Sequence, residues 1–298
     1  MSRRVRYTLV TVLLLLVVLT AAGYFMFGDQ IQAVNSIREI ADGVFYLEYR
    51  GDYGVADFLE QGGAASDAEL TAFLTKFFTK GLYQYEPPEQ LIGCSTIAAQ
   101  LPDGGYGFGR NFDLDDSTVL IMRTVPEDGY ASISTTNQNT DKLDLTTTSA
   151  LRLILDRAAN VEEALALLEQ YDMHASADSD YHFALSDASG RAVVVEYIDD
   201  KMHVLETPVV TNHILLPSSF YKIGLNPGDT RYEVLMEYWE ARDWVMTLDE
   251  TRAALAAAAQ SGGIKTLWSI VYDQSALKLA FYHRRDFDNP IYFNLTER

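Results

Sequence analysis

The fold of this chain is decided by residues 93–113, GCSTIAAQLPDGGYGFGRNFD. Within this stretch, residues 94–100 and 106–111 have the composition of strands, and residues 102–105 between them, Pro-Asp-Gly-Gly, are turn formers. Two strand-like runs that flank a short turn sequence predict a β-hairpin. This hairpin begins at Cys94, the only cysteine of the chain, and its second strand carries the motif Gly-Arg-Asn-Phe-Asp.

Further strands and helices follow the hairpin in groups. Strands are expected at residues 119–124, 130–134, 182–185, 192–197, 202–205, 266–272, 277–282 and 291–295. Helices are expected at residues 151–158, 160–170, 230–241 and 247–260, and capping sequences open the second and the fourth of them. Strands in antiparallel meanders, with helices in separate pairs, indicate a layered α+β fold rather than alternating β-α-β units.

The N-terminus has the pattern of a membrane anchor. No charged residue occurs between Tyr7 and Gly28, and 22 residues of helix extend about 33 Å, enough for a hydrocarbon core of about 30 Å. Arg3, Arg4 and Arg6 precede the apolar run, so the positive-inside rule places everything after it outside the cytoplasm. A cleaved secretory signal is the alternative, and it gives the same extracytoplasmic location.

Three segments are therefore expected: an anchor or signal at residues 1–28, a pro-segment at 29–93 and a catalytic domain at 94–298. The pro-segment contains a predicted strand at residues 44–49 and a predicted helix at 66–81. Two consecutive prolines, at positions 87 and 88, disfavour helix before Cys94 and indicate an extended stretch suited to proteolytic processing.

Composition excludes some functions. The net charge is −19, with 42 acidic against 23 basic residues. Nucleic acid binding needs cations to neutralise phosphates, so nucleic acid is excluded as a partner. None of the 5 histidines has metal-ligand spacing, so no metal is expected. His182, on an apolar strand, is read as a core histidine, with a Cys-His pair as the alternative. A lone cysteine is either a buried small hydrophobe or a reactive thiol, and composition does not choose between them.

The motifs around Cys94 resemble the choloylglycine hydrolase family of N-terminal-nucleophile (Ntn) hydrolases, which includes bile salt hydrolases and penicillin V acylases. The resemblance is to the linear amide C-N hydrolase branch in particular. In that family an arginine lies sixteen residues after the nucleophilic cysteine and an aspartate nineteen residues after it, and Arg110 and Asp113 have these offsets from Cys94. Further similar segments keep the family's order, at residues 181–190, 193–197, 210–212, 230–232 and 266–272. Asn212 and Arg231 thereby take the places of an active-site asparagine and a second arginine.

This resemblance implies a four-layer αββα sandwich that hydrolyses a linear, non-peptide N-acyl amide without a cofactor. Cleavage before Cys94 would make it the N-terminal residue, so that its α-amino group, with a pKa of about 7.7 to 8.0, takes the proton of its own thiol. Arg110 is expected to favour the thiolate and Asp113 to orient the amine. Asn212 is expected to donate to the oxyanion, and Arg231 to hold the polar network.

Each of these residues also has a purely structural interpretation. Arg110 and Asp113 would form an ion pair at the hairpin edge, Asn212 would brace a turn, and Arg231 would pair with Asp229 at a helix start.

One family element is missing from this sequence. The family has a longer stretch between the aspartate and the first helix of the domain, with an asparagine of the oxyanion hole. Here only the polar tract at residues 135–148 is present, and Asn137 or Asn139 is the candidate replacement. Two rivals to the hydrolase therefore stay open, an acyltransferase of the same fold and an inactive, membrane-tethered binding module.

Overall fold

The computed structural model forms two compact units, Met1–Tyr53 with Val119–Thr136, and Gly54–Thr118 with Asn137–Arg298. It describes residues 3–64, 66–81, 93–114, 118–126, 129–137, 147–171, 182–198, 201–216, 230–262 and 264–296. Within these ranges the side chains of residues 3–17, 19, 67, 135–137 and 147–148 are outside the described part. The two proline residues of the predicted processing stretch, and residues 138–146 of the polar tract, also lie outside it.

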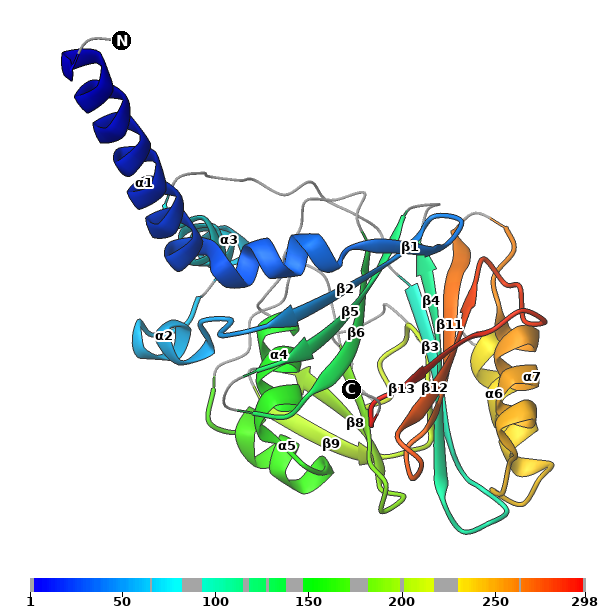
Figure 1. Ribbon diagram of the computed structural model, residues 1–298. Helices are drawn as coiled ribbons and strands as arrows, with labels where there is room; N and C mark the ends of the chain where they lie inside the picture. The colour runs from blue at the N-terminus through cyan, green and yellow to red at the C-terminus, as the bar shows by residue number, and fades with distance from the viewer. Residues whose placement is uncertain are drawn as a thin grey trace. The chain divides into compact units, whose positions relative to one another are not determined.

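A six-stranded antiparallel sheet is the centre of the second unit (Figure 1). Its order is β10 (Val209–Val210), β3 (Gly93–Gln100), β4 (Tyr106–Leu114), β11 (Lys265–Asp273), β12 (Lys278–His283) and β13 (Ile291–Asn294). The predicted hairpin is confirmed as β3 and β4, and the three closing strands are confirmed as β11 to β13. Cys94 faces Phe112 across the hairpin, and Thr96 faces Arg110.

Helices α6 (Thr230–Glu240) and α7 (Leu248–Ala258) pack on this sheet. Leu235 of α6 and Leu255 of α7 are fully buried against Ile97 of β3. A Cβ atom at Gly109 would lie only 2.8 Å from a methyl group of α7, so the glycine allows this close approach. The predicted capping box is confirmed, because the Thr247 side chain accepts from the Glu250 amide and Glu250 accepts from the Thr247 amide.

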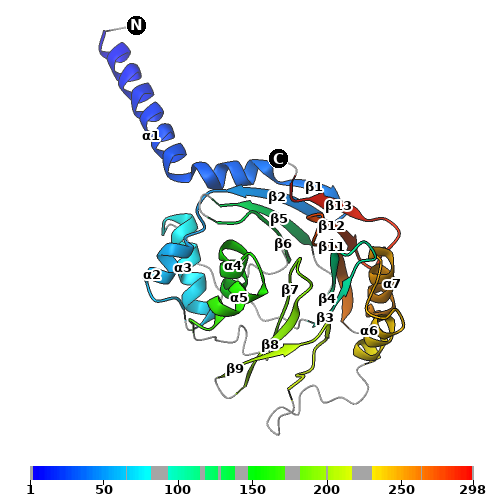
Figure 2. The same ribbon diagram turned by 90° about the horizontal axis from the view of Figure 1, so that it is seen from below.

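A second, three-stranded antiparallel sheet consists of β7 (His182–Ser186), β8 (Ala192–Ile198) and β9 (Lys201–Glu206). Its apolar side chains form one core cluster with helices α4 (Thr147–Arg157) and α5 (Val161–Leu168). In Figure 2 this unit shows α4 and α5, the three-stranded sheet, the six-stranded sheet, and then α6 and α7 in succession. The unit also contains helices α2 (Val55–Glu60) and α3 (Asp67–Thr79), which share a phenylalanine-rich cluster.

The first unit is a four-stranded sheet in the order β1 (Arg38–Ala41), β2 (Val44–Arg50), β5 (Val119–Val125) and β6 (Ser132–Asn137). Strands β2 and β5 run parallel, so the prediction of antiparallel meanders is wrong here. The reason is the long connection between the two strands, which includes the whole β3–β4 hairpin and allows a parallel crossover. Arg123 and Glu48 form an ion pair of 3.1 Å between these two strands.

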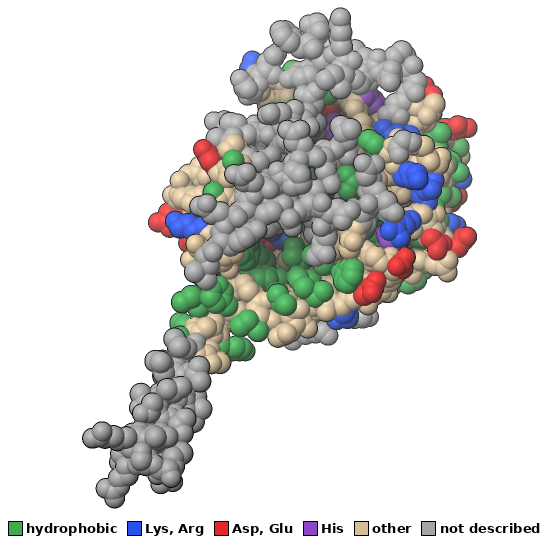
Figure 3. All heavy atoms as spheres, turned by 90° about the horizontal axis from the view of Figure 1, so that it is seen from above, with side chains coloured by type: hydrophobic (Ala, Val, Ile, Leu, Met, Phe, Trp, Pro, Cys, Tyr) green, Lys and Arg blue, Asp and Glu red, His purple; other side chains and the backbone are tan. Residues whose placement is uncertain are grey.

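Helix α1 (Arg3–Ser36) belongs to the first unit and has non-helical backbone angles at Phe27. After this kink the helix approaches β2, where Ser36 Oγ accepts a hydrogen bond of 2.8 Å from the Glu48 amide. Before it, the side chains of Tyr24, Phe25 and Met26 are exposed, and Figure 3 shows hydrophobic side chains gathered on the described part of this helix.

No helix is long and apolar enough to cross a membrane when only the described residues are considered. Most of the apolar run on which the predicted anchor rests, residues 7–28, belongs to the part of α1 whose side chains are not described.

Candidate active site

Cys94 is the second residue of β3, and its half-buried thiol contacts a cation. Arg110 Nη2 donates a hydrogen bond of 3.2 Å to Cys94 Sγ. The hairpin register explains this contact. Because Cys94 pairs with Phe112, Arg110 is its diagonal neighbour two residues away on the same face of the sheet. The structural alternative from the sequence, an ion pair between Arg110 and Asp113, is not what the hairpin forms, because Asp113 pairs with Arg231.

The Arg110 guanidinium is enclosed by aromatic rings. It lies 5.6 Å from the ring centres of both Phe112 and Trp268, which stack on each other at 4.9 Å. Burial acts to lower the pKa of Arg110, but the charge and hydrogen bond of Cys94, with smaller contributions from Tyr272 and Asp113, raise it. A positive charge therefore stays beside the thiol.

Asp113 is fully enclosed at the end of the same strand, with only 1% of its surface exposed. Its Oδ2 accepts from Arg231 Nη1 at 2.8 Å and from Gln260 Nε2 at 2.6 Å. Its Oδ1 accepts from Thr266 Oγ1 at 2.5 Å. The carboxylate is thus held by three donors in a region that excludes water.

Gly93 lies directly opposite Asp113 in the sheet. A Cβ atom added to Gly93 would be 3.3 Å from Asp113 Cβ and 3.5 Å from Asn212 Oδ1. The small residue before Cys94 therefore lets the carboxylate approach the peptide bond that is expected to be cut.

Arg231, the second residue of α6, connects the remaining groups. Besides Asp113 it reaches Asn212 Oδ1, with a hydrogen bond of 2.9 Å from Nη2. Its Nη1 is also 3.5 Å from the carbonyl oxygen of Cys94. Its partner at the helix start is Asp113 from β4, and Asp229, the alternative from the sequence, lies outside the described residues.

Asn212 follows β10 and points its side-chain oxygen at the backbone of Cys94. Its Oδ1 accepts a hydrogen bond of 2.9 Å from Cys94 N, as well as the one from Arg231. This contact is with the nitrogen that would become the α-amine. The structure therefore brings all five predicted side chains together, while their catalytic roles stay predictions.

Two residues of this network were not predicted from the sequence. Thr266 is the second residue of β11 and lies opposite Asp113, at an irregularity in the register. Gln260 follows α7, and its backbone N–H donates to Thr266 Oγ1 at 2.8 Å. Thr266 begins the segment 266–272 that resembles the family, but only the pairing of β4 with β11 reveals its contact with Asp113. Gln260 belongs to no motif, and only the packed structure shows its contact with Asp113.

Other candidates from the sequence lie elsewhere or cannot be placed. His182 approaches Glu196, with 3.8 Å between Nδ1 and Oε1, and burial lowers its pKa despite that carboxylate. The side chain of Asn137 and the whole of Asn139 lie outside the described part of the chain. Among the described residues, no group of three or more potential metal ligands is found.

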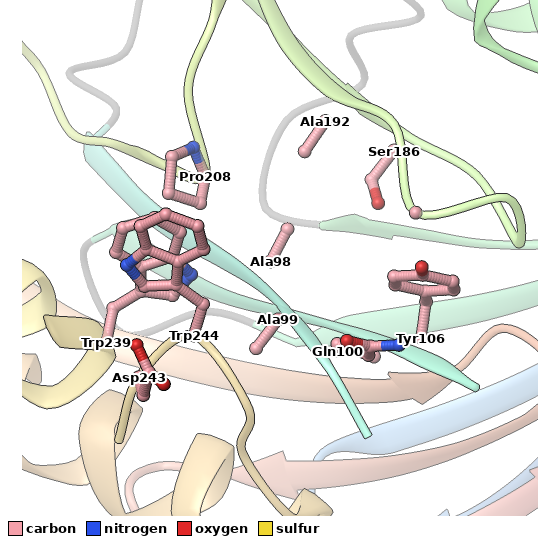
Figure 4. A pocket seen from close by; sticks show the side chains of 12 residues that line it. Ala98, Ala99, Gln100, Tyr106, Ser186, Ala192, Pro208, Trp239, Asp243 and Trp244 are labelled. Atoms are coloured by element: carbon pink, nitrogen blue, oxygen red, sulfur yellow. The ribbon is translucent and has the colours of Figure 1, made fainter. Parts of the chain in front are cut away.

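A cavity of about 240 Å³ lies toward the far end of β3 and includes none of the five residues (Figure 4). Ala98, Ala99 and Gln100 form its floor, and the stacked indoles of Trp239 and Trp244 form one side. Ala98 is the fourth residue after Cys94 along the strand, about 13 Å of extended chain away, so the cavity is distinct from the polar network.

The fold is mixed α/β and is built from several sheets. The family model for linear amide C-N hydrolases, choloylglycine hydrolase family, matches residues 128–215 of this chain. The resemblance seen in the sequence is thus confirmed. Members of this family are hydrolases that act on non-peptide carbon–nitrogen bonds in linear amides. The matched residues include Asn212 but not Cys94.

Two solved structures align with this chain. A mutant conjugated bile acid hydrolase from Clostridium perfringens aligns with 69% of this chain and 93% of its own, with a TM-score of 0.50 and 13% identity. A penicillin V acylase from Agrobacterium tumefaciens aligns with 68% of this chain and 77% of its own, with a TM-score of 0.36 and 18% identity. The first likeness shows the fold alone. No curated protein matches this chain by sequence.

Proposed function

We propose that this chain is a cysteine hydrolase of linear N-acyl amides, with Cys94 as its N-terminal nucleophile after cleavage of the bond to Gly93. One observation carries the proposal. Both chemically important atoms of Cys94 contact the predicted partners, since Sγ accepts from Arg110 and the backbone nitrogen donates to Asn212. A cysteine buried only for packing would need neither contact.

The proposed precursor step is an attack of the Cys94 thiol on the carbonyl carbon of Gly93. A carbon–sulfur bond forms, the carbon–nitrogen bond breaks, and the thiol proton ends on the new α-amine. Water then hydrolyses the thioester and restores the thiol. In favour of this route, Asp113 and Asn212 both lie within 3.5 Å of the position that a Gly93 side chain would take.

In the mature enzyme the freed α-amine acts as the base for the thiol on the same residue. Asn212 Oδ1 already accepts from this nitrogen and would orient the amine. Asn212 Nδ2 makes no hydrogen bond within the described part of the chain, which leaves it for the developing oxyanion. Arg110 favours the thiolate by charge.

The same proposal assigns the remaining parts of the chain. The second unit supplies the αββα sandwich of an Ntn hydrolase, in the order of layers visible in Figure 2. Residues 29–93 act as a pro-segment, and residues 94–298 form the catalytic domain. No cofactor is required, because amine and thiol are both provided by Cys94.

Incubation of the purified protein with a thiol-reactive acyl probe and with N-acyl amides tests the function. A conjugated bile acid and a series of N-acyl amino acids are suitable substrates, and intact mass locates both the probe and the new N-terminus. We expect an acyl adduct on Cys94, a chain that starts there, and release of the free acid. Without adduct and turnover the protein is an inactive module, and acyl transfer to an added amine would indicate an acyltransferase.

Replacing Asn212 with alanine should lower kcat by about 100- to 1,000-fold with little change in KM, because its contacts act on the amine and the oxyanion rather than on bound substrate. Steady-state kinetics on the best N-acyl amide measures this change. Asn294→Ala, on the last strand, is the matched control and should keep the wild-type kcat. A higher KM with an unchanged kcat would contradict the assignment of Asn212 to the chemical step.

We further propose that residues 7–28 anchor the protein to a membrane, with the catalytic domain outside the cytoplasm. Supporting features are the apolar run with its preceding arginines and the exposed Tyr24 and Phe25, since aromatic residues favour the membrane interface. The full-length chain should sediment with membranes and resist an alkaline wash, whereas a chain starting at residue 29 should stay in the supernatant. Full-length protein in the supernatant would refute the anchor.

A further inference from the structure

The segment that carries Asn212 is irregular and needs support from elsewhere in the fold. Strand β10 ends at Val210, so residues 211–216 have no ladder of hydrogen bonds to hold them. Asn212 itself is exposed, yet its Oδ1 is positioned at 2.9 Å from Cys94 N. Something must fix the backbone of this segment, because a misplacement of about 1 Å in an active site can cost about 100-fold in rate.

A buried carboxylate supplies that support. Glu196 lies in β8, the central strand of the three-stranded sheet, with 1% of its surface exposed. Its Oε1 accepts from the Leu215 amide at 2.6 Å, and its Oε2 accepts from the Leu216 amide at 2.9 Å. Hydrogen bonds to a charged acceptor are stronger than neutral ones, and here both carboxylate oxygens engage consecutive amides of one loop.

The other end of the segment is held by groups next to Glu196 and next to the active site. His182, which faces Glu196 across β7 and β8, hydrogen bonds to the backbone of Thr211. His213 contacts the Thr211 hydroxyl at 2.9 Å, and its ring meets the edge of Tyr232, the neighbour of Arg231 in α6. The segment is therefore attached on both sides of Asn212.

We propose that Glu196 is a positioning residue, which fixes residues 211–216 so that Asn212 meets the nitrogen of Cys94. The inference rests on the proposed function and adds a residue to it that touches neither substrate nor nucleophile. The three-stranded sheet is then more than a structural layer. Its central strand sets the geometry of a catalytic group on a different segment.

Glu196→Gln is the direct test because it keeps the shape and replaces one acceptor oxygen by an NH₂ group that faces a backbone N–H. We expect kcat to fall by about 100-fold with KM nearly unchanged. Glu206→Gln makes the same chemical change on β9, where Glu206 pairs with Arg191 at the surface, and should keep the wild-type kcat. An unchanged kcat in Glu196→Gln would overturn the proposal.

A double substitution separates positioning from general damage. If Glu196 acts through Asn212, adding Glu196→Gln to Asn212→Ala should lower kcat no further, because residues that act as one unit are not additive. A full additional loss in the double variant would mean that Glu196 acts elsewhere, and would overturn the inference.

Amide hydrogen exchange in the full-length protein gives a readout that does not depend on activity. Glu196→Gln should raise exchange at Leu215 and Leu216 by at least about tenfold, while helix α7 keeps its protection. Unchanged exchange at the two leucines overturns the positioning role. If wild-type protein neither turns over amides nor cleaves itself, the proposed function fails. The exchange measurement still shows whether Glu196 holds the amides of Leu215 and Leu216. If Glu196→Gln does not fold, Glu196→Asp takes its place, because it keeps both carboxylate oxygens on a side chain that is one methylene shorter. It should raise exchange at the same two leucines to a smaller degree.

Discussion

Cys94→Ala should leave the chain uncut between residues 93 and 94 and abolish hydrolysis of N-acyl amides. The substitution removes the sulfur atom that Arg110 contacts at 3.2 Å, and both proposed steps begin with attack by that atom. Intact mass measures the cleavage, and release of free acid measures turnover. We expect a single full-length species and a rate at the background of the assay.

Ser95→Ala is the matched control for this experiment. Ser95 is the next residue, and its side chain is buried. The substitution removes one oxygen atom, whereas Cys94→Ala removes one sulfur atom. This variant should cleave itself and turn over substrate like the wild type. If Cys94→Ala is cut at the same bond, an external protease performs the processing, and the autocatalytic step is refuted even where hydrolysis is lost.

Asp113→Asn should abolish hydrolysis and also destabilise the protein by about 3 to 5 kcal/mol, the usual cost of breaking a buried ion pair from one side. The structural alternative from the sequence, an ion pair of Asp113 with Arg110 at the hairpin edge, would cost only about 0 to 1 kcal/mol when lost. The structure contradicts that alternative, because the carboxylate is 1% exposed and binds Arg231, Gln260 and Thr266. The asparagine would place an NH₂ group against one of these donors.

Urea unfolding and kinetics below the unfolding transition separate the two effects. Asp103→Asn is the control, since Asp103 lies in the exposed hairpin turn and accepts only a local hydrogen bond from Gly105 in the described structure. It should change both kcat and stability very little. An Asp113→Asn protein that is folded and has wild-type kcat would restrict Asp113 to a structural role.

Part of the site follows from local sequence. The hairpin that carries Cys94, Arg110 and Asp113 is specified by two strand runs and one turn, and the side-chain period of two then sets which residues share a face. The contact between Arg110 and Cys94 is the result. Asn212 and Arg231 were predicted only through the family resemblance, because no local pattern links residues so distant in sequence.

Secondary structure shows the same division. Caps at Asn160 and Thr247 were predicted correctly, since each depends on a side chain and an amide three residues apart. The parallel pairing of β2 with β5 was not foreseen. Which strands pair depends on how the apolar faces of distant segments pack, and the hydrophobic pattern of each strand is the same for either partner.

The sequence by itself determined the hairpin and the helix caps, because these depend on neighbours within a few residues. Only the tertiary structure decided that Asp113 is buried among three donors and that Gln260 and Thr266 hold it. It also decided that Glu196 binds the loop of Asn212. Those contacts join segments that are far apart in the chain, and burial and hydrogen-bond partners at such points arise only when the sheets and helices pack together.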